Sequence, residues 1–484
     1  MRQRLTIFII IFMSSISIAY SQQAVVCPIG LPDRPALSQH IEQQDIVSGS
    51  ISLEQIIEHG HTLFITAFNR CDGQGRPATT GTGQHREPDE PVFSRISAPD
   101  ANACSGCHNQ PFVGGAGDFV ANVFVLGQAA DPVLNTTDAE FSNNRNTLGL
   151  FGSGPIEMVA REMTRDLHHI RDETIVEATA TGQLVVASLD TKGVNFGMIT
   201  ARPDGTVDTN AIQGVDADLI IRPFHQSGVV VSLREFTVNA MNHHHGMQAE
   251  ERFDLNPEKG ISDYDGDGVE RELTIGDITA LTIWQAALNV PGRVTPTDPN
   301  ISASAQLGEI LFSDIGCASC HKPELQLESC MFTEPNELNP TGTISDTSQV
   351  VLIVDMCQIS GLESYGSGAI VRAYTDLKRH NLCDDPDIDD AIRFFCDEQL
   401  AQNRPDQNGR PGSEFFLTRK LWDVGNSAPY GHGGNLTTIA EAILMHGGEA
   451  RPSRDMFSNM PYKDQLAIVD FLRTLQTTPD ADES

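Results

Sequence analysis

The sequence predicts a mainly α fold with two compact domains, and three observations lead to this prediction. The motif Cys-x-x-Cys-His occurs twice, at residues 104–108 and 317–321, once in each half of the chain. Segments with apolar residues at helical spacing stand on both sides of the motifs. Short β-branched runs separated by glycine and aspartate turns concentrate in residues 185–238, where they indicate hairpins inserted into the first domain.

The first 21 residues have the pattern of a signal peptide. Arg2 and Arg4 precede an apolar run from Leu5 to Ile18, and small residues stand at the −3 and −1 positions before Gln22. The run is shorter than the about 20 residues of a membrane-spanning helix, which disfavours a retained anchor. A lipid on Cys27 is disfavoured because no small residue precedes it. We therefore expect export to the periplasm, with secretion as the alternative, and a mature chain without a membrane span.

Behind the signal peptide, the chain divides into two predicted domains. Two prolines in Arg293–Ile301 mark the boundary, so we expect a first domain at 22–295, a second at 296–478 and an acidic tail at 479–484. Helices are predicted, in chain order, at 53–69, 157–170, 274–290, 302–312, 385–401, 438–446 and 460–474.

The chain is strongly acidic, with 65 acidic against 32 basic residues and a net charge of −33. This balance argues against nucleic acid or an anionic membrane as a partner. A basic redox protein would be attracted, although an acidic surface that keeps an exported protein soluble explains the charge equally well. The expected electron partner is a small redox protein or a quinol-linked donor or acceptor.

Ten cysteines are typical of an exported chain, and six of them lie outside the two motifs. Six cysteines suit three disulfides, with fifteen alternative pairings. Cys330 with Cys357 and Cys383 with Cys396 are close in sequence, which leaves Cys27 with Cys71 as the third predicted pair.

The two Cys-x-x-Cys-His motifs carry the strongest chemical signal. Two thiols at this spacing lie on one turn and can each add to a vinyl group of one porphyrin, and the histidine that follows binds the iron. A single copy would also fit a zinc half-site or a thiol redox motif, but two copies in an exported chain favour haem over zinc. We predict two covalently bound haem c groups, one held by Cys104, Cys107 and His108 and one by Cys317, Cys320 and His321.

The residues before the second motif sharpen the fold prediction. Gly308, Phe312 and Gly316 are typical of the entry helix of class I cytochromes c, where the glycine and phenylalanine pack against a C-terminal helix. The predicted fold is therefore two class I-like cytochrome c domains, the N-terminal one with long inserts that contain some β-structure.

The runs Leu421–Gly434 and Leu436–Ala442 resemble the bacterial dihaem cytochrome c peroxidase superfamily. The nearer likeness is to its dihaem oxidoreductases, sometimes labelled thiol oxidoreductase-like, whose closing His-Gly-Gly-Glu-Ala stands here as His446–Ala450. The resemblance covers both haem regions and their order along the chain. It implies a peroxidase-like oxidoreductase with electron transfer between two haems.

The resemblance also implies the sixth ligand of the second iron. In the peroxidases this ligand is a methionine fourteen residues after the position of His432, where the present chain has His446. Two histidines give a lower reduction potential than histidine with methionine, because a thioether favours ferrous iron. The alternatives are Met445 as the ligand, or His446 as a cation at a helix end.

For the first iron, the candidates are the consecutive histidines His243, His244 and His245. A methionine of the related family falls near His245, so His245, or alternatively His244, is the expected sixth ligand. Three neighbouring histidines point in different directions, and a surface metal-binding tract is the other interpretation. The reserve ligands are Met158, Met163 and Met247.

A weak internal repeat relates Asn146–Gly154 to Asn426–Gly434, which fits duplication of one haem unit. In peroxidatic relatives the helix after the first copy supplies a glutamate that assists O–O cleavage. Glu157 is therefore a candidate acid or base, with Glu162 close by. An ordinary charged helix face explains these residues as well.

The segment Asp263–Val269 has the alternating aspartates and the turn glycine of a calcium loop. An EF-hand would have glutamate where Thr274 stands, so the closing ligand must differ, and Glu272 or Asp277 could serve. The predicted ligands of one Ca²⁺ are Asp263, Asp265, Asp267, Val269 and Glu272.

Three functions fit these features. The first is a peroxidase-like oxidoreductase, the second is a purely electron-transferring cytochrome with both irons six-coordinate, and the third is an oxidative modifier of a macromolecule. Trp284 and Trp422 are the two tryptophans. We expect Trp284 in the core and Trp422 near the haem-flanking run.

Overall fold

The structure is a computed structural model of the chain. It describes residues 26–75, 101–118, 120–123, 143–253, 260, 262–346, 352–396 and 414–477. The predicted signal peptide and acidic tail lie outside these ranges. Within them, the helices are too short or too polar for a membrane span.

A close helix pair supports the second motif. α7 (Pro299–Asp314) lies against α11 (Tyr462–Thr474), and a side chain on Gly308 would come within 1.8 Å of the Ala467 carbonyl oxygen. Only glycine allows this approach. Phe312, one turn later, is buried in the contact. The predicted packing of a glycine and a phenylalanine against a C-terminal helix is therefore present.

The first motif has a matching pair that the sequence analysis did not identify. α2 (Leu53–Ile65) lies against α6 (Ile275–Ala287), and a side chain on Gly60 would come within 2.2 Å of the Ala280 carbonyl oxygen. Phe64 follows four residues after the glycine, as Phe312 does in the other pair. The two halves of the chain therefore use the same helix crossing.

The remaining described helices are short, with one exception. The predicted helices near 53, 157, 274, 302, 438 and 460 are confirmed, whereas residues 385–396 form turns instead of the expected helix. The other helices are α1 (Gln43–Ser48), α3 (Ser153–Thr181), α4 (Leu233–Ala240), α5 (Glu250–Phe253), α8 (Met356–Ile359), α9 (Ile439–Leu444) and α10 (Arg451–Asn459).

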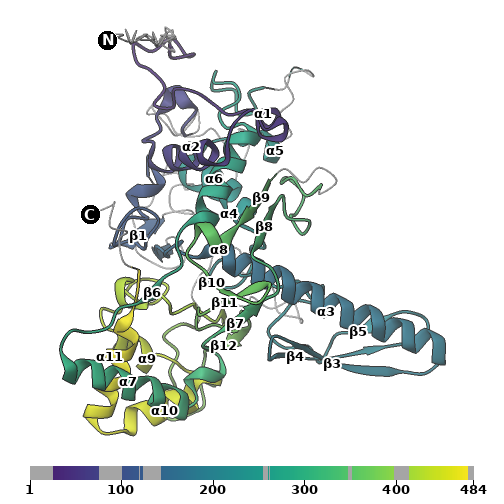
Figure 1. Ribbon diagram of the computed structural model, residues 1–484, viewed down its shortest axis with the longest axis vertical. Helices are drawn as coiled ribbons and strands as arrows, with labels where there is room; N and C mark the ends of the chain where they lie inside the picture. The colour runs from purple at the N-terminus through teal and green to yellow at the C-terminus, as the bar shows by residue number, and fades with distance from the viewer. Residues whose placement is uncertain are drawn as a thin grey trace, which may run out of the picture.

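The long helix α3 and the predicted hairpins form an arm that projects from the body (Figure 1). β3 (Val185–Thr191), β4 (Val194–Ala201) and β5 (Val207–Asp208) make an antiparallel sheet in that order. Leu189 and Phe196 on its inner face are buried, and α3 contacts β3 and β4. The N-terminal insert therefore has the expected β-structure.

Further small sheets make the described chain a mixed structure, so the expectation of a mainly α fold holds only in part. The prediction placed β-structure in the first domain alone, but several sheets follow the second motif. The further antiparallel sheets of both halves are β1 (Val120–Val123) with β2 (Asn143–Asn146), β6 (Gly292–Arg293) with β14 (Leu475–Gln476), β8 (Met331–Glu334) with β9 (Leu352–Asp355), β12 (Arg379–Asn381) with β13 (Phe415–Leu417), and β10 (Glu363–Tyr365), β11 (Gly368–Val371) and β7 (Leu325–Leu327) in that order.

The sheets after the second motif pack into the core of the first half. Leu327, Phe332 and Val371 belong to the same buried cluster as Phe64 and Trp284. A separate cluster joins α7 to α11. The hydrophobic core therefore does not divide at the predicted boundary between residues 295 and 296.

All three predicted disulfides are present. Cys27 pairs with Cys71, Cys330 with Cys357, and Cys383 with Cys396. The four motif cysteines are not in disulfides. Three disulfides are typical of proteins in oxidising compartments outside the cytoplasm.

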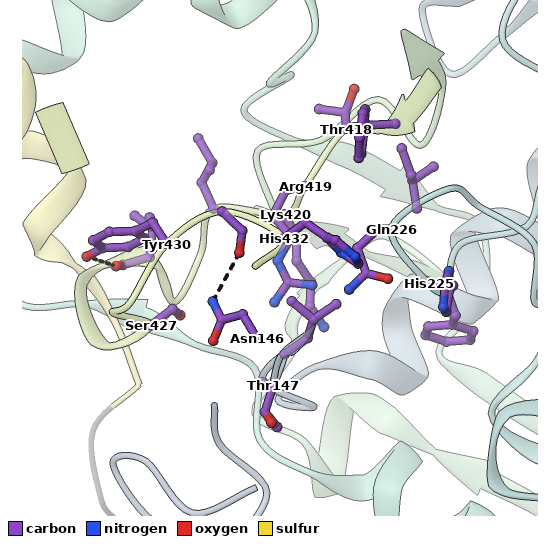
Figure 2. A pocket seen from close by; sticks show the side chains of 18 of the residues that line it. Asn146, Thr147, His225, Gln226, Thr418, Arg419, Lys420, Ser427, Tyr430 and His432 are labelled. Carbon is purple, nitrogen blue, oxygen red and sulfur yellow. Dashed lines mark hydrogen bonds between the residues drawn. The ribbon is translucent and has the colours of Figure 1, made fainter. Parts of the chain in front are cut away.

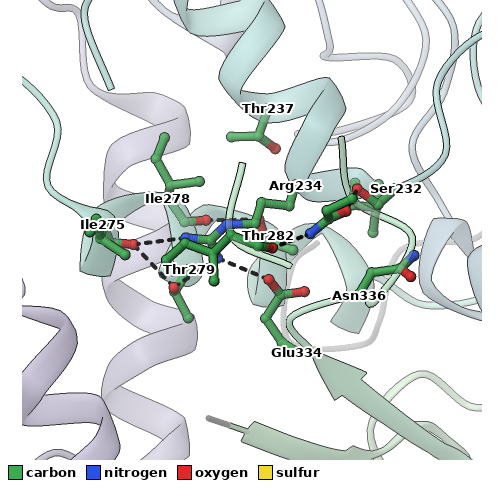
Figure 3. A network of polar contacts seen from close by, with 12 residues as sticks. Ser232, Arg234, Thr237, Ile275, Ile278, Thr279, Thr282, Glu334 and Asn336 are labelled. Carbon is green, nitrogen blue, oxygen red and sulfur yellow. Dashed lines mark hydrogen bonds and ion pairs between the residues drawn. The ribbon is translucent and has the colours of Figure 1, made fainter. Parts of the chain in front are cut away.

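A buried arginine joins elements from distant parts of the chain (Figure 3). Arg234, on α4, is 1% exposed and donates to Glu334 at the end of β8 over 2.9 Å and to Glu251 on α5 over 3.0 Å. It also donates to Thr279 on α6 over 3.0 Å. These contacts hold α4 in place, and the turn that carries the histidine triplet follows α4 directly in the chain.

We expect Arg234→Met to destabilise the protein strongly, because it leaves the buried carboxylates of Glu251 and Glu334 without their cation. Removal of one partner of a buried ion pair costs about 3–5 kcal/mol. The control is Arg372→Met, since Arg372 is half-exposed and bonds two exposed glutamates, so its loss should change stability little. Urea unfolding of both variants measures the difference, and equal losses would contradict a central role for Arg234.

Candidate haem-binding site

One cavity of about 520 Å³ is lined by both Cys-x-x-Cys-His motifs. Figure 2 shows another part of its wall, with Arg419, Lys420 and His432. The cavity volume lies in the range of about 300–1,000 Å³ that is usual for ligand pockets. Most of its lining is apolar. The motif residues in its wall are Cys104, Cys107, His108, Cys317, Cys320 and His321.

Both motifs adopt the same local structure. A short 3₁₀ turn begins at each first cysteine, and the histidine N–H donates to the carbonyl of that cysteine over 3.0 Å in both copies. Burial raises the pKa of Cys104 to about 12 and that of Cys317 to about 11. Zinc requires thiolates, so this environment disfavours the zinc alternative.

At the first motif, two histidines approach the cavity from different elements. Burial, followed by the charge of His244, lowers the pKa of His108 to about 4, which keeps the imidazole neutral as a metal ligand requires. His245 Nδ1 donates to the carbonyl of Ala101 over 2.9 Å, and its Nε2 lies 3.4 Å from Cys104 Sγ. The ring of Phe68 lies against His245.

The histidine triplet lies on a π-helical turn, Met241–His245, that continues α4. His244 and His245 line the cavity. Both expected alternatives for the sixth ligand therefore reach the first site. The reserve ligands Met158, Met163 and Met247 are buried in the hydrophobic core instead.

At the second motif, His321 and His446 line the same part of the cavity. His321 Nδ1 donates to the Tyr374 carbonyl over 3.1 Å, and His446 Nδ1 donates to the Ala442 carbonyl over 2.8 Å. Each bond holds the proton on Nδ1 and leaves Nε2 as the ligand atom. Burial, followed by the charge of His446, lowers the pKa of His321 to about 4. Met445 packs in an apolar cluster with Phe395.

The residues present thus fit haem at both sites. Burial raises the pKa of the first cysteine of each motif and lowers the pKa of His108, His321 and His446. A backbone carbonyl orients His245, His321 and His446. The two copies of the internal repeat meet beside the cavity, where Asn146 N–H donates to the His432 carbonyl over 2.9 Å. A side chain on Gly152 would come within 2.2 Å of the Trp422 ring, so the loops are in close contact.

Comparison with known proteins agrees with this geometry. The family model described as "Di-haem oxidoreductase, putative peroxidase" matches residues 387–475, which include His446. Residues 387–475 are therefore similar to the di-haem oxidoreductase family. The family implies haem, and the two motifs are consistent with it.

Similarity to other proteins is weak. No curated protein matches the chain. Among solved structures, a hydrazine synthase from Kuenenia stuttgartiensis shares 12% identity at a TM-score of 0.35, covering 98% of this chain and 100% of that chain. A MauG-like protein associated with microbial copper homeostasis shares 13% identity at a TM-score of 0.29, covering 57% of this chain and 77% of that chain. At these identities and TM-scores, neither likeness indicates the chemistry of the chain.

Glu157, the candidate acid or base, lies outside the lining of the cavity. It is completely buried, and its carboxylate accepts from Asn336 Nδ2 over 3.0 Å, from Leu233 N–H over 2.8 Å and from Arg161. Its neighbour Ile156 lines the cavity instead. The bond from Leu233 joins Glu157 to the start of α4, and the bond from Asn336 joins it to the segment after β8, so its position favours a structural role. Glu162 likewise pairs with Lys192 over 2.7 Å.

The aspartates of the predicted calcium loop lie together. Oxygens of Asp263, Asp265 and Asp267 are within 4.8 Å of one another. Burial, with the charges of the other two aspartates, raises the pKa of Asp267 to about 6. Glu272 accepts from the backbone of Gln248 over 2.8 Å. Asp277 is bonded to His40 and His59, away from the loop.

Three basic residues in the cavity wall were missed by the sequence analysis. Arg419 and Lys420 directly precede the family run at Leu421, and Arg454 follows the closing motif. Their position beside the matched segments was the available signal. His380 was missed as well. It lines the cavity, and its two ring nitrogens bond the carboxylates of Asp376 and Glu449.

If His446 is the sixth ligand of the second iron, we expect His446→Gly to remove that ligand. That iron should become five-coordinate and high-spin and should bind cyanide readily, as its absorption and electron paramagnetic resonance spectra would show. His446→Met should raise the reduction potential of the same haem, because a thioether favours ferrous iron.

The control for this experiment is Met445→Leu, which changes the apolar cluster and leaves His446 in place. It should retain the wild-type spectra. If His446→Gly also leaves the low-spin signals unchanged, the ligand assignment is wrong.

Proposed function

We propose that the chain is an exported dihaem c-type oxidoreductase of the peroxidase type, with two covalently bound haems that exchange electrons. The observation that carries this proposal is the common cavity, into which both motifs open and in which a second imidazole accompanies each motif histidine. The matching helix pairs α2–α6 and α7–α11 support two class I-like cytochrome c units. The three disulfides support export to the periplasm.

The chemistry follows from what each part supplies. Haem iron, when bound, supplies one-electron redox steps. Reduction of a peroxide to water or alcohol takes two electrons and two protons, so two one-electron centres match one turnover. The chain contributes ligand orientation through Ala101, Tyr374 and Ala442, and a largely apolar wall that limits water. For turnover, the histidine opposite one motif must leave its position and open that side to peroxide.

Electron transfer without turnover is the second candidate. The presence of His245 or His244 at one site and His446 at the other favours it, because six-coordinate irons have no position for a substrate. Either function suits an acidic protein that receives electrons from a small basic redox partner.

We expect two haems per chain when the protein is produced in a host with c-type maturation, and both should remain attached after denaturing electrophoresis. Cys104→Ala and Cys317→Ala should each weaken the attachment of one haem. Each variant leaves the other motif intact, so the haem at the unchanged motif serves as the internal control. A single haem, or zinc in place of iron, would refute the proposal.

Peroxide separates the two candidates. Under the peroxidase proposal, the fully reduced protein is oxidised rapidly by hydrogen peroxide, with one peroxide consumed per two haems. Under electron transfer alone, oxidation is slow and both low-spin spectra persist during mixing. Stopped-flow absorption measures both rates.

We also propose that the aspartate loop Asp263–Val269 binds one Ca²⁺, with Glu272 as a further ligand. A chelator should then lower the melting temperature, because a ligand that binds only the folded state at 100 times its Kd stabilises it by about 2.7 kcal/mol. Asp265→Ala should abolish this chelator effect, whereas Asp204→Ala, in an exposed turn, should retain it. Equal melting of the wild type with and without chelator would count against a bound ion.

A further inference from the structure

The charge of the cavity wall is opposite to that of the protein. Acidic residues outnumber basic ones two to one in the chain, 65 against 32. The described lining nevertheless contains three basic side chains, Arg419, Lys420 and Arg454, which we call the basic wall, and Glu449 as its carboxylate. Glu449 is already bonded to His380 over 2.7 Å. The cavity therefore presents a positive surface to whatever it holds.

Arg419 and Lys420 lie between the two motifs without a carboxylate of their own. Among the residues that the structure describes, none brings a carboxylate within ion-pair distance of either. Lys420 Nζ donates to the neutral oxygens of Phe151 and Ser153, over 3.2 and 3.3 Å. Burial, and then the charge of Arg419, lowers the pKa of Lys420 to about 7. Two adjacent cations held in this way are stabilised by an anion.

Arg454 provides an independent observation at the second motif. Its side chain is 13% exposed, and one guanidinium nitrogen bonds Asp455 over 3.1 Å. Its Nε and Nη2 are buried and have no hydrogen-bond partner in the described part of the chain. Buried N–H groups in a native protein are almost always satisfied, so a ligand acceptor is expected here.

We propose that the basic wall binds the carboxylates of the porphyrins, with Arg419 and Lys420 at the boundary between the two sites and Arg454 beside the second. This inference rests on the proposed function, since it requires haem at both motifs. Each haem c brings two propionate carboxylates, and guanidinium groups bind carboxylates in bidentate geometry. A cation beside the porphyrin also favours the ferrous form, which carries one positive charge fewer at iron than the ferric form.

The test is redox titration of Arg419→Gln, Lys420→Gln and Arg454→Gln, followed by absorption. At least one haem should shift to lower potential in each variant, by about tenfold in its ferric–ferrous equilibrium constant, or 59 mV for a one-electron couple. Arg419→Lys should restore most of the shift because the charge is kept. Arg372→Gln, on the exposed surface, should leave both potentials unchanged.

A free anion is the other source of a carboxylate, and a second titration separates the two. If the porphyrin carboxylates occupy the basic wall, adding acetate or succinate at constant ionic strength leaves the wild-type potentials unchanged. A succinate-dependent shift that Arg419→Gln abolishes would assign the wall to a free anion and overturn the proposal. Unchanged potentials in all three variants that still hold two haems would also overturn it. A wild-type chain without haem would instead refute the proposed function.

Discussion

The bond from a histidine Nδ1 to a backbone carbonyl is the interaction on which the rest of the site depends. An imidazole binds iron in one geometry only if its proton and its ring plane are both fixed. Ala101 fixes His245, Tyr374 fixes His321, and Ala442 fixes His446. The accepting carbonyls come from loops or helix ends, so the surrounding core must hold those loops in place.

Buried charges provide much of that support at the first site. Arg234 joins α4 to α5, α6 and β8, and Glu157 accepts from the backbone at the start of α4. Since α4 runs directly into the turn that carries His244 and His245, these ion pairs position the two proposed ligands without touching them. A catalytic interpretation of Glu157 from its sequence position alone could not detect this, because its partners Leu233 and Asn336 are far away in the chain.

Local chemistry was predictable from the sequence, and long-range packing was not. The spacing of each Cys-x-x-Cys-His motif and the distance from His432 to His446 identified groups that now line one cavity, and short sequence separation identified the disulfides. The packing of residues 325–377 against the first half depends on contacts of α3 with β7 and β8, which lie far from α3 in the sequence, and local patterns do not encode such contacts. Residues 385–396 belong to a loop that the Cys383–Cys396 disulfide closes, and they form turns. In this loop the backbone N–H of Ile392 donates to the Asp384 carboxylate instead of to a helix carbonyl.

The central claim is that each of two irons is held between two histidines, and electron paramagnetic resonance of the protein as isolated tests it most directly. The ferric protein should give two low-spin signals of equal intensity, each typical of two imidazole ligands, with no high-spin component. A high-spin signal that accounts for one of the two irons would contradict histidine ligation on both sides at that site. A single low-spin signal with half the expected intensity would contradict the assignment of two haems.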